Sequence, residues 1–451
     1  MTARPASRTS PSSSDPVSPE QFAALVSPVE TSLDGARLAV AVSGGADSMA
    51  LLRLLAGWAK RRDKSLTALT VDHGLRPESA NEAILVGHWC SAIGVPHVIL
   101  NWTGEKPTRR VQEKARRARY DLMEDWCVRE KVGDLFVAHT QNDQAETFLF
   151  RMSRGSGPDG LAAMPLVSLR DRVRLVRPLL TIDRQRVEAT LRASGQDWVE
   201  DPGNADRRYA RVRIRQQLPA LEAQGISTAS MAGAARIFGR LRAARDRDVA
   251  RLAEEILALN PEGYAEIDRP AFAAADPDVS LALMTSVIAC VGGRDFAPRR
   301  ARGSRLWELL VHGPDRVART LGGCGISASR SWIRVWREPA AIPDSRPVTG
   351  ADCFAWDGRF LIDLNPSRAQ ADAFVSALGR AGWEHIANEV DDSFRRIPGP
   401  VRYGLPAIRR DGEILQVWHL QYRSPQMVEN IIENAVLKAR SPISAPPFWV
   451  A

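Results

Sequence analysis

Between residues 37 and 153 the sequence alternates short apolar runs with longer segments of helical periodicity. The short runs have the length of strands, and the longer segments place apolar residues on one helical face. Successive strand–helix units fold with their strands parallel, so the pattern predicts an α/β fold with helices on both faces of a parallel sheet. The predicted strands are 37–42, 66–71, 96–100 and 134–138, and the helices are 48–60, one ending near 93, 111–131 and 142–153.

The 451 residues leave room for several domains. Residues 1–18 are rich in Ser and Pro and have no apolar block, which predicts a disordered tail rather than a targeting signal. We place the α/β domain at 19–221. The helical periodicity of 222–315 predicts a helical segment, and the strand-like runs and Asp-Gly hairpin signals of 316–451 predict a small α+β C-terminal domain.

Charge and cysteine content bound the class of protein. The net charge of +8 favours a polyanionic partner. The five cysteines form no C-x-x-C pair, which argues against a disulfide framework or a thiolate metal site and predicts a cytoplasmic protein. No apolar run approaches the roughly 18 residues that a membrane span requires, so we expect no membrane partner.

A turn rich in Gly and Ser stands where the first predicted strand meets its helix. Two adjacent glycines let the backbone approach a ligand and adopt positive φ. Exposed N–H groups, a helix N-terminus and two hydroxyls favour phosphate binding, although the turn matches neither a Walker loop nor G-x-G-x-x-G. An acidic side chain beside phosphates implies an intervening Mg²⁺ ion. The residues of this turn are Ser43, Gly44, Gly45, Ala46, Asp47 and Ser48.

Polar clusters also follow the second and fourth predicted strands, and ligands of parallel sheets bind beyond the carboxyl ends of the strands. Asp72 and His73 follow the second strand and are expected either to contact a nucleotide or to form an Asx-type turn. His139, Asp143 and Glu146 follow the fourth strand. Their spacing suits either a shared catalytic face or a solvated helix face with a capping residue.

Two stretches are strongly basic. Residues 106–120 contain seven basic side chains and one acidic one, and residues 207–215 contain five basic side chains. Such runs suit contacts with a phosphate backbone, and an ordinary solvated face is the alternative. The candidate contact residues are Arg116, Arg119, Arg208 and Arg211.

Taken together, the ordered motifs resemble those of the tRNA(Ile)-lysidine synthases, members of the PP-loop superfamily of N-type ATP pyrophosphatases. The motifs are S-G-G-x-D-S, D-H-G-L-R, A-H-x-x-x-D-Q-x-E-T, R-G-S-G-x-x-G-L, R-P-L-L and W-x-x-D-x-x-N, within about residues 38–221. The resemblance implies an adenine-nucleotide α-hydrolase-like fold for this domain. Val212 stands where the family usually has Asn, which puts a side-chain role at that position in doubt.

The resemblance also implies a two-step ligation that uses ATP and Mg²⁺. The C2 oxygen of the wobble cytidine in the CAU anticodon of tRNA(Ile) attacks the α-phosphate and releases pyrophosphate. The ε-amine of free L-lysine then attacks C2 and expels AMP. The product, lysidine, pairs with A instead of G, so the codon changes from AUG to AUA and the amino acid from Met to Ile. The oligomeric state stays open, with a homodimer as one option.

The matching motifs imply roles for the residues already singled out. Residues 43–48, Asp72 and His73 are expected to bind ATP. Asp47 and Asp143 are expected to hold Mg²⁺, and the helical segment and C-terminal region to recognise tRNA. The catalytic set implied is Asp47, His139, Asp143 and Glu146, and the set for tRNA or lysine is Arg116, Arg119, Arg177, Arg208 and Arg211.

Three other functions stay open at this point. A tRNA thiolase would need catalytic cysteines, often as C-x-x-C. An adenylating amidotransferase or NAD-synthetase-like enzyme that acts on small molecules would not need the basic helix, the D-Q-x-E-T motif or the C-terminal domain. A non-catalytic RNA-binding protein would not need the intact S-G-G-x-D-S turn or the carboxylates Asp143 and Glu146.

Overall fold

The chain divides into two compact units. Unit 1 comprises Met1–Ala244 with Pro447–Ala451, and unit 2 comprises Arg245–Pro446. The division falls within the long helix α9 (Thr228–Ile256). The computed structural model describes residues 15–451 apart from 34, 105, 108–110, 171–172, 201–209, 344, 349–352, 366–371, 428, 440 and 444–447, and apart from the side chains of 112, 210 and 211.

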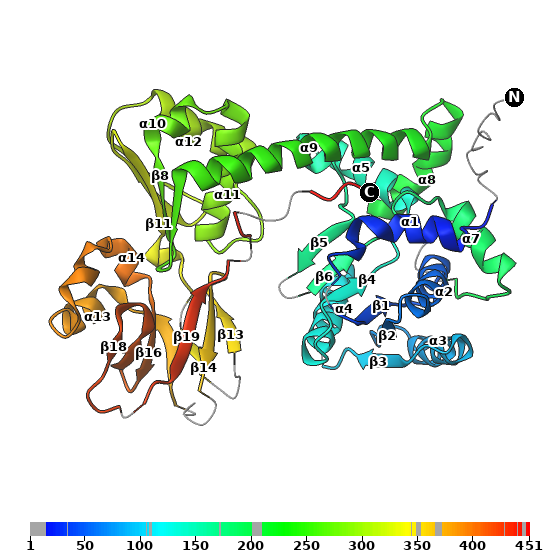
Figure 1. The fold of residues 1–451 in the computed structure, drawn as a ribbon, viewed down its shortest axis with the longest axis horizontal. Helices are drawn as coiled ribbons and strands as arrows, with labels where there is room; N and C mark the ends of the chain where they lie inside the picture. The colour runs from blue at the N-terminus through cyan, green and yellow to red at the C-terminus, as the bar shows by residue number, and fades with distance from the viewer. Residues whose placement is uncertain are drawn as a thin grey trace, which may run out of the picture. The chain divides into compact units, whose positions relative to one another are not determined.

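Unit 1 holds a six-stranded sheet in the order β3-β2-β1-β4-β6-β5 (Figure 1). All strands are parallel except β5, which runs antiparallel to β6. The predicted α/β fold is therefore confirmed. The strands are β1 (Arg37–Ala41), β2 (Ser65–Asp72), β3 (His97–Asn101), β4 (Asp134–Phe136), β5 (Val167–Arg170) and β6 (Val173–Val176). The helices are α1 (Pro19–Glu30), α2 (Ala46–Lys60), α3 (Ser79–Ile93), α4 (Val111–Arg129), α5 (Gln141–Met152), α6 (Pro158–Leu161), α7 (Arg184–Ala193) and α8 (Ala210–Ala223).

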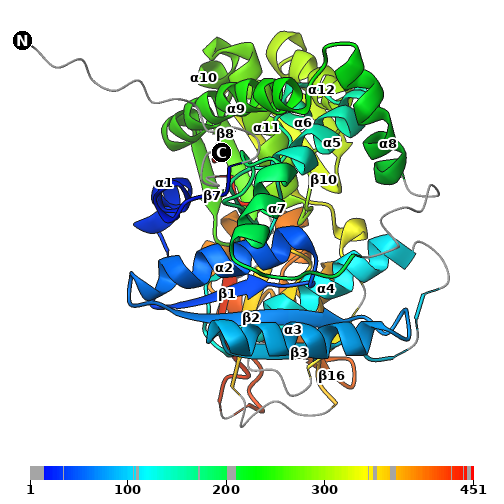
Figure 2. The ribbon, with the colours of Figure 1, turned by 90° about the vertical axis from the view of Figure 1, so that its right-hand side faces the viewer.

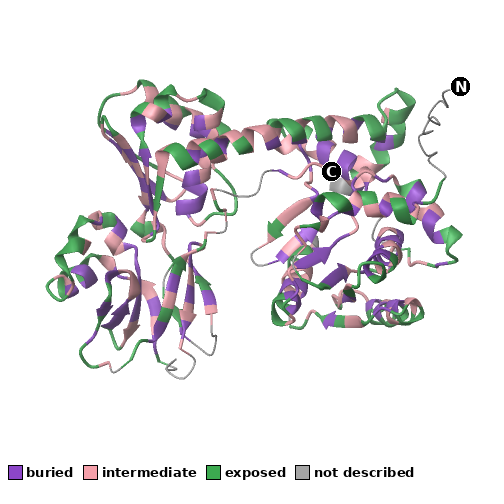
Figure 3. Ribbon diagram, in the orientation of Figure 1, coloured by how far each residue is buried: buried purple, intermediate pink, exposed green. Residues whose placement is uncertain are grey.

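The central strand β1 is buried on both faces (Figure 3). Side chains alternate between the faces of a sheet, so Leu38 and Val40 pack with α1 and α2 in one core cluster. Ala39 packs with Met123 and Trp126 of α4 in a second cluster. Figure 2 shows α2 lying along one face of the sheet. Double-sided burial explains why this strand reads as a continuous apolar run rather than an alternating one.

The strand order brings three polar segments to one edge of the sheet. β1 lies between β2 and β4 and runs parallel to both. The turn 43–48, the pair 72–73 and the segment 139–146 follow these strands in the chain. Parallel strands end at the same edge, so all three segments stand at the place where ligands of open α/β sheets bind.

The packed part of unit 1 begins before α1. Val17 is 4% exposed, and its N–H donates to Thr190 Oγ1 of α7. Ser18 and Gln21 form a capping box at the start of α1. Residues 15–18, which the sequence suggested as the end of a disordered tail, thus make specific contacts because Val17 is apolar. Residues 1–14 of that tail lie outside the described part of the chain.

Unit 2 begins with an antiparallel sheet in the order β7-β8-β11-β10-β9. Helical periodicity did not reveal its first two strands, which follow α9 directly. The elements are β7 (Leu257–Asn260), β8 (Tyr264–Asp268), α10 (Arg269–Ala274), α11 (Pro277–Val291), α12 (Arg300–His312), β9 (Val317–Leu321), β10 (Cys324–Ala328) and β11 (Trp332–Arg337).

Two further antiparallel sheets complete unit 2, in the orders β12-β15-β16-β17-β18 and β13-β14-β19. Both Asp-Gly signals form hairpin turns with positive φ, at 357–358 and 411–412. The elements are β12 (Arg346–Pro347), β13 (Cys353–Trp356), β14 (Phe360–Leu364), β15 (Phe374–Ala377), α13 (Gly379–Ile386), α14 (Gly399–Tyr403), β16 (Pro406–Arg410), β17 (Glu413–Val417), β18 (Tyr422–Arg423) and β19 (Ile432–Leu437). No helix in the described ranges has both the length and the apolar character needed to cross a bilayer.

Three charged side chains are buried together in unit 2. The exposed fractions are 1% for Asp357, 6% for Arg337 and 2% for Arg359. Arg337 Nη2 lies 2.6 Å from Asp357 Oδ1, and Arg359 Nε lies 2.7 Å from Oδ2. The guanidinium groups also donate to the carbonyl oxygens of Gly292 and Gly404. Both oxygens of this carboxylate thus accept charge-assisted hydrogen bonds.

Candidate functional site

The turn between β1 and α2 depends on its first glycine. Gly44 has φ +84°, and a Cβ atom there would lie 3.0 Å from Val86 Cγ2. Its carbonyl oxygen accepts the N–H of Val199 at 2.9 Å. Gly45 is the N-cap of α2, where no side chain caps the helix. The turn therefore leads into a helix N-terminus without a side-chain cap, a geometry that suits an anion, and the phosphate cradle remains a prediction.

The two serines of the turn have different surroundings. Ser48 is buried, and its hydroxyl accepts the N–H of Ser43 at 3.2 Å and donates to Gly45 O at 2.9 Å. Ser43 is exposed, and its Oγ lies 3.3 Å from Ser48 Oγ. Ser48 thus holds the shape of the turn, whereas the hydroxyl of Ser43 lies at the surface.

Asp47 lies in the first turn of α2. Its Oδ1 is buried and has no hydrogen-bond partner among the described residues. Burial and, next in size, the negative charge of Asp143 raise the pKa of Asp47 to about 6, although Arg184 and Arg215 oppose this shift. A buried carboxylate oxygen without a partner is costly unless a ligand completes it.

These residues fit a Mg²⁺ ion. Mg²⁺ in nucleotide sites is held by one or two carboxylates together with phosphate oxygens. Asp47 supplies a buried oxygen with no hydrogen-bond partner among the described residues, directly after the Gly-Ser turn, and the charge of Asp143 is one cause of its raised pKa. No group of three His, Cys, Asp or Glu side chains suited to a metal occurs in the described part of the chain, so a cage built from protein ligands alone is absent there.

Asp143 and Glu146 on α5 have partners that the sequence did not reveal. Asp143 Oδ2 accepts the N–H and the hydroxyl of Thr140 at 2.9 and 3.1 Å in a capping box. Glu146 is 3% exposed, and its two oxygens accept bonds from Arg215 Nε at 2.6 Å and Nη2 at 3.1 Å. The bond to Glu146 is the main cause that raises the pKa of Arg215. The helix therefore offers Asp143 at its start and a neutralised ion pair one turn later.

His139 lies beside the basic helix α4. Nη2 of Arg116 is 3.5 Å from His139 Nε2 and 3.4 Å from the hydroxyl of Tyr120. A guanidinium only donates hydrogen bonds, so in this contact His139 Nε2 stands on the acceptor side. The structure thus brings together a residue expected to be catalytic and one expected to bind tRNA or lysine.

The Asp72–His73 pair forms the Asx-type turn that was the structural alternative. Asp72 Oδ1 accepts the hydroxyl of Ser79 at 2.6 Å and the N–H of Gly74 at 3.0 Å. These bonds, that of Ser79 foremost, lower the pKa of Asp72. His73 Nδ1 accepts the N–H of Leu75. Both side chains shape the exit of β2, and their contact with a nucleotide remains a prediction.

The predicted arginines fall into three groups. Arg177 is 8% exposed and donates to Pro165 O and Ser168 Oγ, and burial lowers the pKa of its guanidinium to about 10. It therefore joins the start of β5 to the end of β6 from within the protein, and its contact with tRNA or lysine remains a prediction. Arg116 is exposed and Arg119 half-buried on α4. Arg208 and the side chain of Arg211 lie outside the described residues.

Two further arginines, Arg215 and Arg184, belong to the site and were not predicted from the sequence. Both act on the charge of Asp47, and Arg215 lies in the basic stretch 207–215. The sequence indicated Arg215 only as one of several arginines in this basic stretch, and nothing in the pattern distinguished it from the others. Arg184 begins α7, where its N–H donates to Asn142 Oδ1 at 3.0 Å.

Comparisons with known proteins agree with this geometry. A family model described as a PP-loop domain matches residues 16–221. The tRNA(Ile)-lysidine synthase of Ruegeria pomeroyi is 40% identical over 354 residues, 77% of this chain and 80% of that protein. That of Wolbachia pipientis wMel is 32% identical over 89% of this chain and 94% of its own. That of Bradyrhizobium sp. is 38% identical over 68% of this chain and 91% of its own.

Proposed function

The chain belongs to the tRNA(Ile)-lysidine synthase family, and we propose that it joins free lysine to C2 of the wobble cytidine in the CAU anticodon of tRNA(Ile), using ATP. The observation that carries the proposal is the buried carboxylate oxygen of Asp47, which has no hydrogen-bond partner among the described residues and follows an uncapped, glycine-rich turn. This arrangement suits a cation and the phosphates of ATP.

In the first step, the C2 oxygen of the cytidine attacks the α-phosphorus of ATP and the bond to the β-phosphate breaks. The turn 43–48 holds the departing pyrophosphate with its backbone N–H groups and the Ser43 hydroxyl. When bound, Mg²⁺ held by Asp47 and Asp143 supplies positive charge that stabilises the pyrophosphate. Asp72 and His73 fix the backbone that follows β2, and this segment is proposed to contact the nucleotide.

In the second step, the ε-amine of lysine attacks C2 and the C2–oxygen bond breaks, so that AMP leaves. The amine must lose a proton before it attacks. His139 is the proposed acceptor, because both oxygens of Glu146 accept bonds from Arg215, and Asp143 accepts bonds from Thr140 and is proposed to hold Mg²⁺. Glu146 instead keeps Arg215 beside the two aspartates. The modified tRNA then reads AUA as isoleucine instead of AUG as methionine.

Four of the five cysteines are buried free thiols, and Cys353 in unit 2 is half-buried. Burial raises the pKa of Cys90, Cys127, Cys290 and Cys324, which disfavours the reactive thiolate. The thiols therefore argue against a thiolase, and they suit a cytoplasmic location. The phosphate backbone of the tRNA is proposed to contact Arg116, Arg119, Arg208 and Arg211, and a homodimer stays part of the proposal.

The decisive experiment is incubation of the protein with ATP, radiolabelled lysine and tRNA(Ile) that carries CAU. Label is expected in the tRNA at the wobble position, with one AMP and one pyrophosphate per lysine. The same tRNA with a UAU anticodon is the matched control and should take up no lysine. Transfer of sulfur or ammonia in place of lysine would overturn the proposal.

A further inference from the structure

The chain returns to unit 1 at residues Phe448, Trp449, Val450 and Ala451, which we name the 448–451 segment (Figure 1). Trp449 and Ala451 pack against the main core cluster of this unit. The carbonyl oxygen of Trp449 accepts the N–H of Leu166 at 2.8 Å. Residues that follow unit 2 in the sequence are therefore built into the catalytic unit.

Phe448 is seated against α9. The side chain is 9% exposed, and the guanidinium of Arg242 lies 4.9 Å from its ring centre. It clusters with Ala162 and Ala243. A Cβ atom on Gly239 would lie 2.9 Å from Phe448 Cε1, which is closer than carbon atoms approach. The ring thus occupies a position on α9 that only glycine at 239 leaves open.

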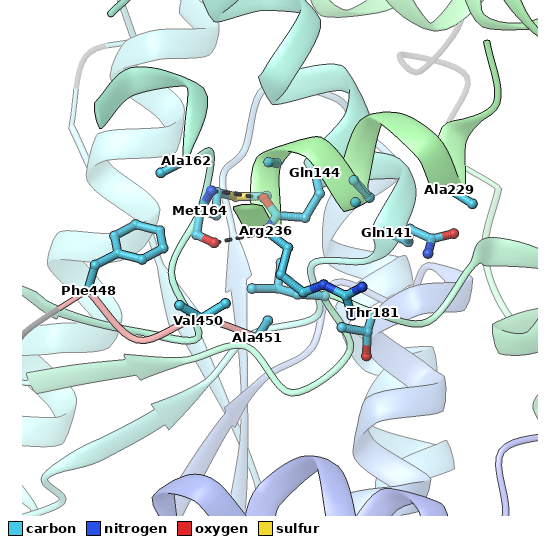
Figure 4. A pocket seen from close by; sticks show the side chains of 14 residues that line it. Gln141, Gln144, Ala162, Met164, Thr181, Ala229, Arg236, Phe448, Val450 and Ala451 are labelled. Atoms are coloured by element: carbon cyan, nitrogen blue, oxygen red, sulfur yellow. Dashed lines mark hydrogen bonds between the residues drawn. The ribbon is translucent and has the colours of Figure 1, made fainter. Parts of the chain in front are cut away.

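Residues 160–166 connect the 448–451 segment to α5. The side-chain amide of Gln144 donates to Met164 O at 2.8 Å and accepts the N–H of Met164 at 2.9 Å, as Figure 4 shows. Arg151, near the end of α5, donates to Gly160 O and Ala163 O. One side of this stretch is therefore bound to α5, while Leu166 and Ala162 contact the 448–451 segment.

The helix held in this way carries site residues. Asp143 and Glu146 lie on either side of Gln144 in the sequence of α5. A cavity of about 120 Å³ is lined by Gln141 and Gln144 of α5 and by Val450 and Ala451 (Figure 4). The cavity lies between α5 and the 448–451 segment. The connection between the two therefore runs mainly through residues 160–166, which are hydrogen-bonded to α5.

We propose that the 448–451 segment is a positioning element for the ligation. It fixes residues 160–166 and, through the pair of hydrogen bonds to Gln144, the place of Asp143 relative to the turn 43–48. The inference rests on the proposed function, because one of its two tests measures the rate of lysine transfer. A displacement of about 1 Å at a reacting group is enough to lower a rate by up to about 100-fold.

The test compares two glycines of the same helix. Gly239→Ala places a methyl group against Phe448, whereas a Cβ on Gly233 meets nothing within 4 Å. Both substitutions replace Gly by Ala within a helix and raise the intrinsic helix propensity by the same amount. If the 448–451 segment has no role in positioning, the two variants should be equally active. We expect Gly239→Ala to lower kcat for lysine transfer by about 10- to 100-fold with an unchanged KM for ATP, and Gly233→Ala to match the wild type.

Hydrogen–deuterium exchange provides the second readout. Exchange of the amides within residues 162–166 is expected to rise in Gly239→Ala and not in Gly233→Ala. Adding Phe448→Leu to Gly239→Ala removes the clash while retaining an apolar side chain, and should restore both exchange and kcat.

Three results would overturn the inference: an unchanged kcat in Gly239→Ala, a lower kcat without faster exchange in residues 162–166, or equal losses in both glycine variants. Absence of lysine transfer in the wild type would overturn the proposed function instead. Exchange would then decide by itself whether the segment holds residues 160–166.

Discussion

Asp47 of unit 1 and Asp357 of unit 2 are both acidic side chains inside the protein, and they differ in what surrounds them. Asp357 has two arginines on its two oxygens and is 1% exposed. Asp47 has a buried oxygen with no hydrogen-bond partner among the described residues, and its strongest charged neighbour, Asp143, is also acidic. The first carboxylate is satisfied by the fold, whereas the second is open to the cation that we propose for this site.

Whether a buried carboxylate has hydrogen-bond partners therefore distinguishes a structural residue from a functional one better than its exposed fraction does. A buried ion pair with all its bonds made stabilises one arrangement of chain segments and leaves nothing for a ligand. A buried carboxylate without a partner destabilises the fold and is therefore expected where chemistry requires it. Glu146 and Arg215 lie between these cases, as a complete pair within the candidate site.

The largest expected effect is the loss of lysine transfer in Asp47→Asn. The amide carries no negative charge for Mg²⁺, while the shape of the turn stays the same. Radiolabel transfer to tRNA(Ile) measures the effect, and circular dichroism checks the fold. Transfer at the wild-type rate would remove Asp47 from the site.

The same substitution is expected to change stability with pH. The folded-state pKa of Asp47 is about 6, above its ordinary 3.8, so this group favours the folded state most below pH 4. That contribution is lost as the pH rises from about 4 to 6, and it amounts to about 3 kcal/mol. In metal-free urea titrations at pH 7.5, Asp47→Asn should be the more stable protein, and the difference should vanish near pH 4.

Next in size is the effect of Arg359→Met, which leaves the carboxylate of Asp357 with one partner. Breaking a buried pair costs about 3–5 kcal/mol, so the free energy of unfolding of unit 2 should fall by that order. Urea titration followed by tryptophan fluorescence measures it. Arg380→Met removes an exposed pair with Glu384 and should cost less than about 1 kcal/mol. Equal losses in the two variants would contradict the comparison.

Arg215→Met tests the intermediate case. It removes both charge-assisted hydrogen bonds that Arg215 donates to the buried Glu146, and the free energy of unfolding should fall by about 3 kcal/mol. The double variant Arg215→Met/Glu146→Gln also removes the negative charge of residue 146 and should recover most of this stability without recovering transfer. Recovery of transfer as well would show that the pair acts only in folding.

The smallest effect is expected from Arg116→Ala on α4. Loss of one phosphate contact should weaken tRNA binding several-fold and reduce the salt slope of the binding constant by about one unit. Arg117→Ala on the same helix is the control, because Arg117 is 79% exposed and lies near Asp121. Filter binding at several salt concentrations measures both slopes, and equal slopes would assign Arg116 to the solvated face.

The sequence predicted the parts of unit 1 that are local in the chain. The run Leu38–Val42 and the Gly-Ser turn identify a strand, a turn and a helix start within a few residues, and each was found. Contacts between distant segments could not be read in this way. Glu146 and Arg215 are separated by 69 residues, and nothing in either local pattern specifies the other.

Unit 2 shows a second limit of sequence patterns. β7, at Leu257–Asn260, follows the last turn of α9 directly, and its four residues continue an apolar periodicity that also suits a helix. Only pairing with β8 makes it a strand. The Asp-Gly turns were predictable because two adjacent residues set the positive φ that the hairpins need.

The contacts of the 448–451 segment bear on how the protein is synthesised. Unit 1 is not contiguous in the sequence, because roughly 200 residues of unit 2 are translated before this segment. At about 5–20 residues per second, the ribosome needs about 10–40 s for them. During that time the residues of the turn 43–48 have already been made, whereas the Trp449 carbonyl that Leu166 contacts has not. The contacts of unit 1 with the 448–451 segment therefore form only after unit 2 has been translated.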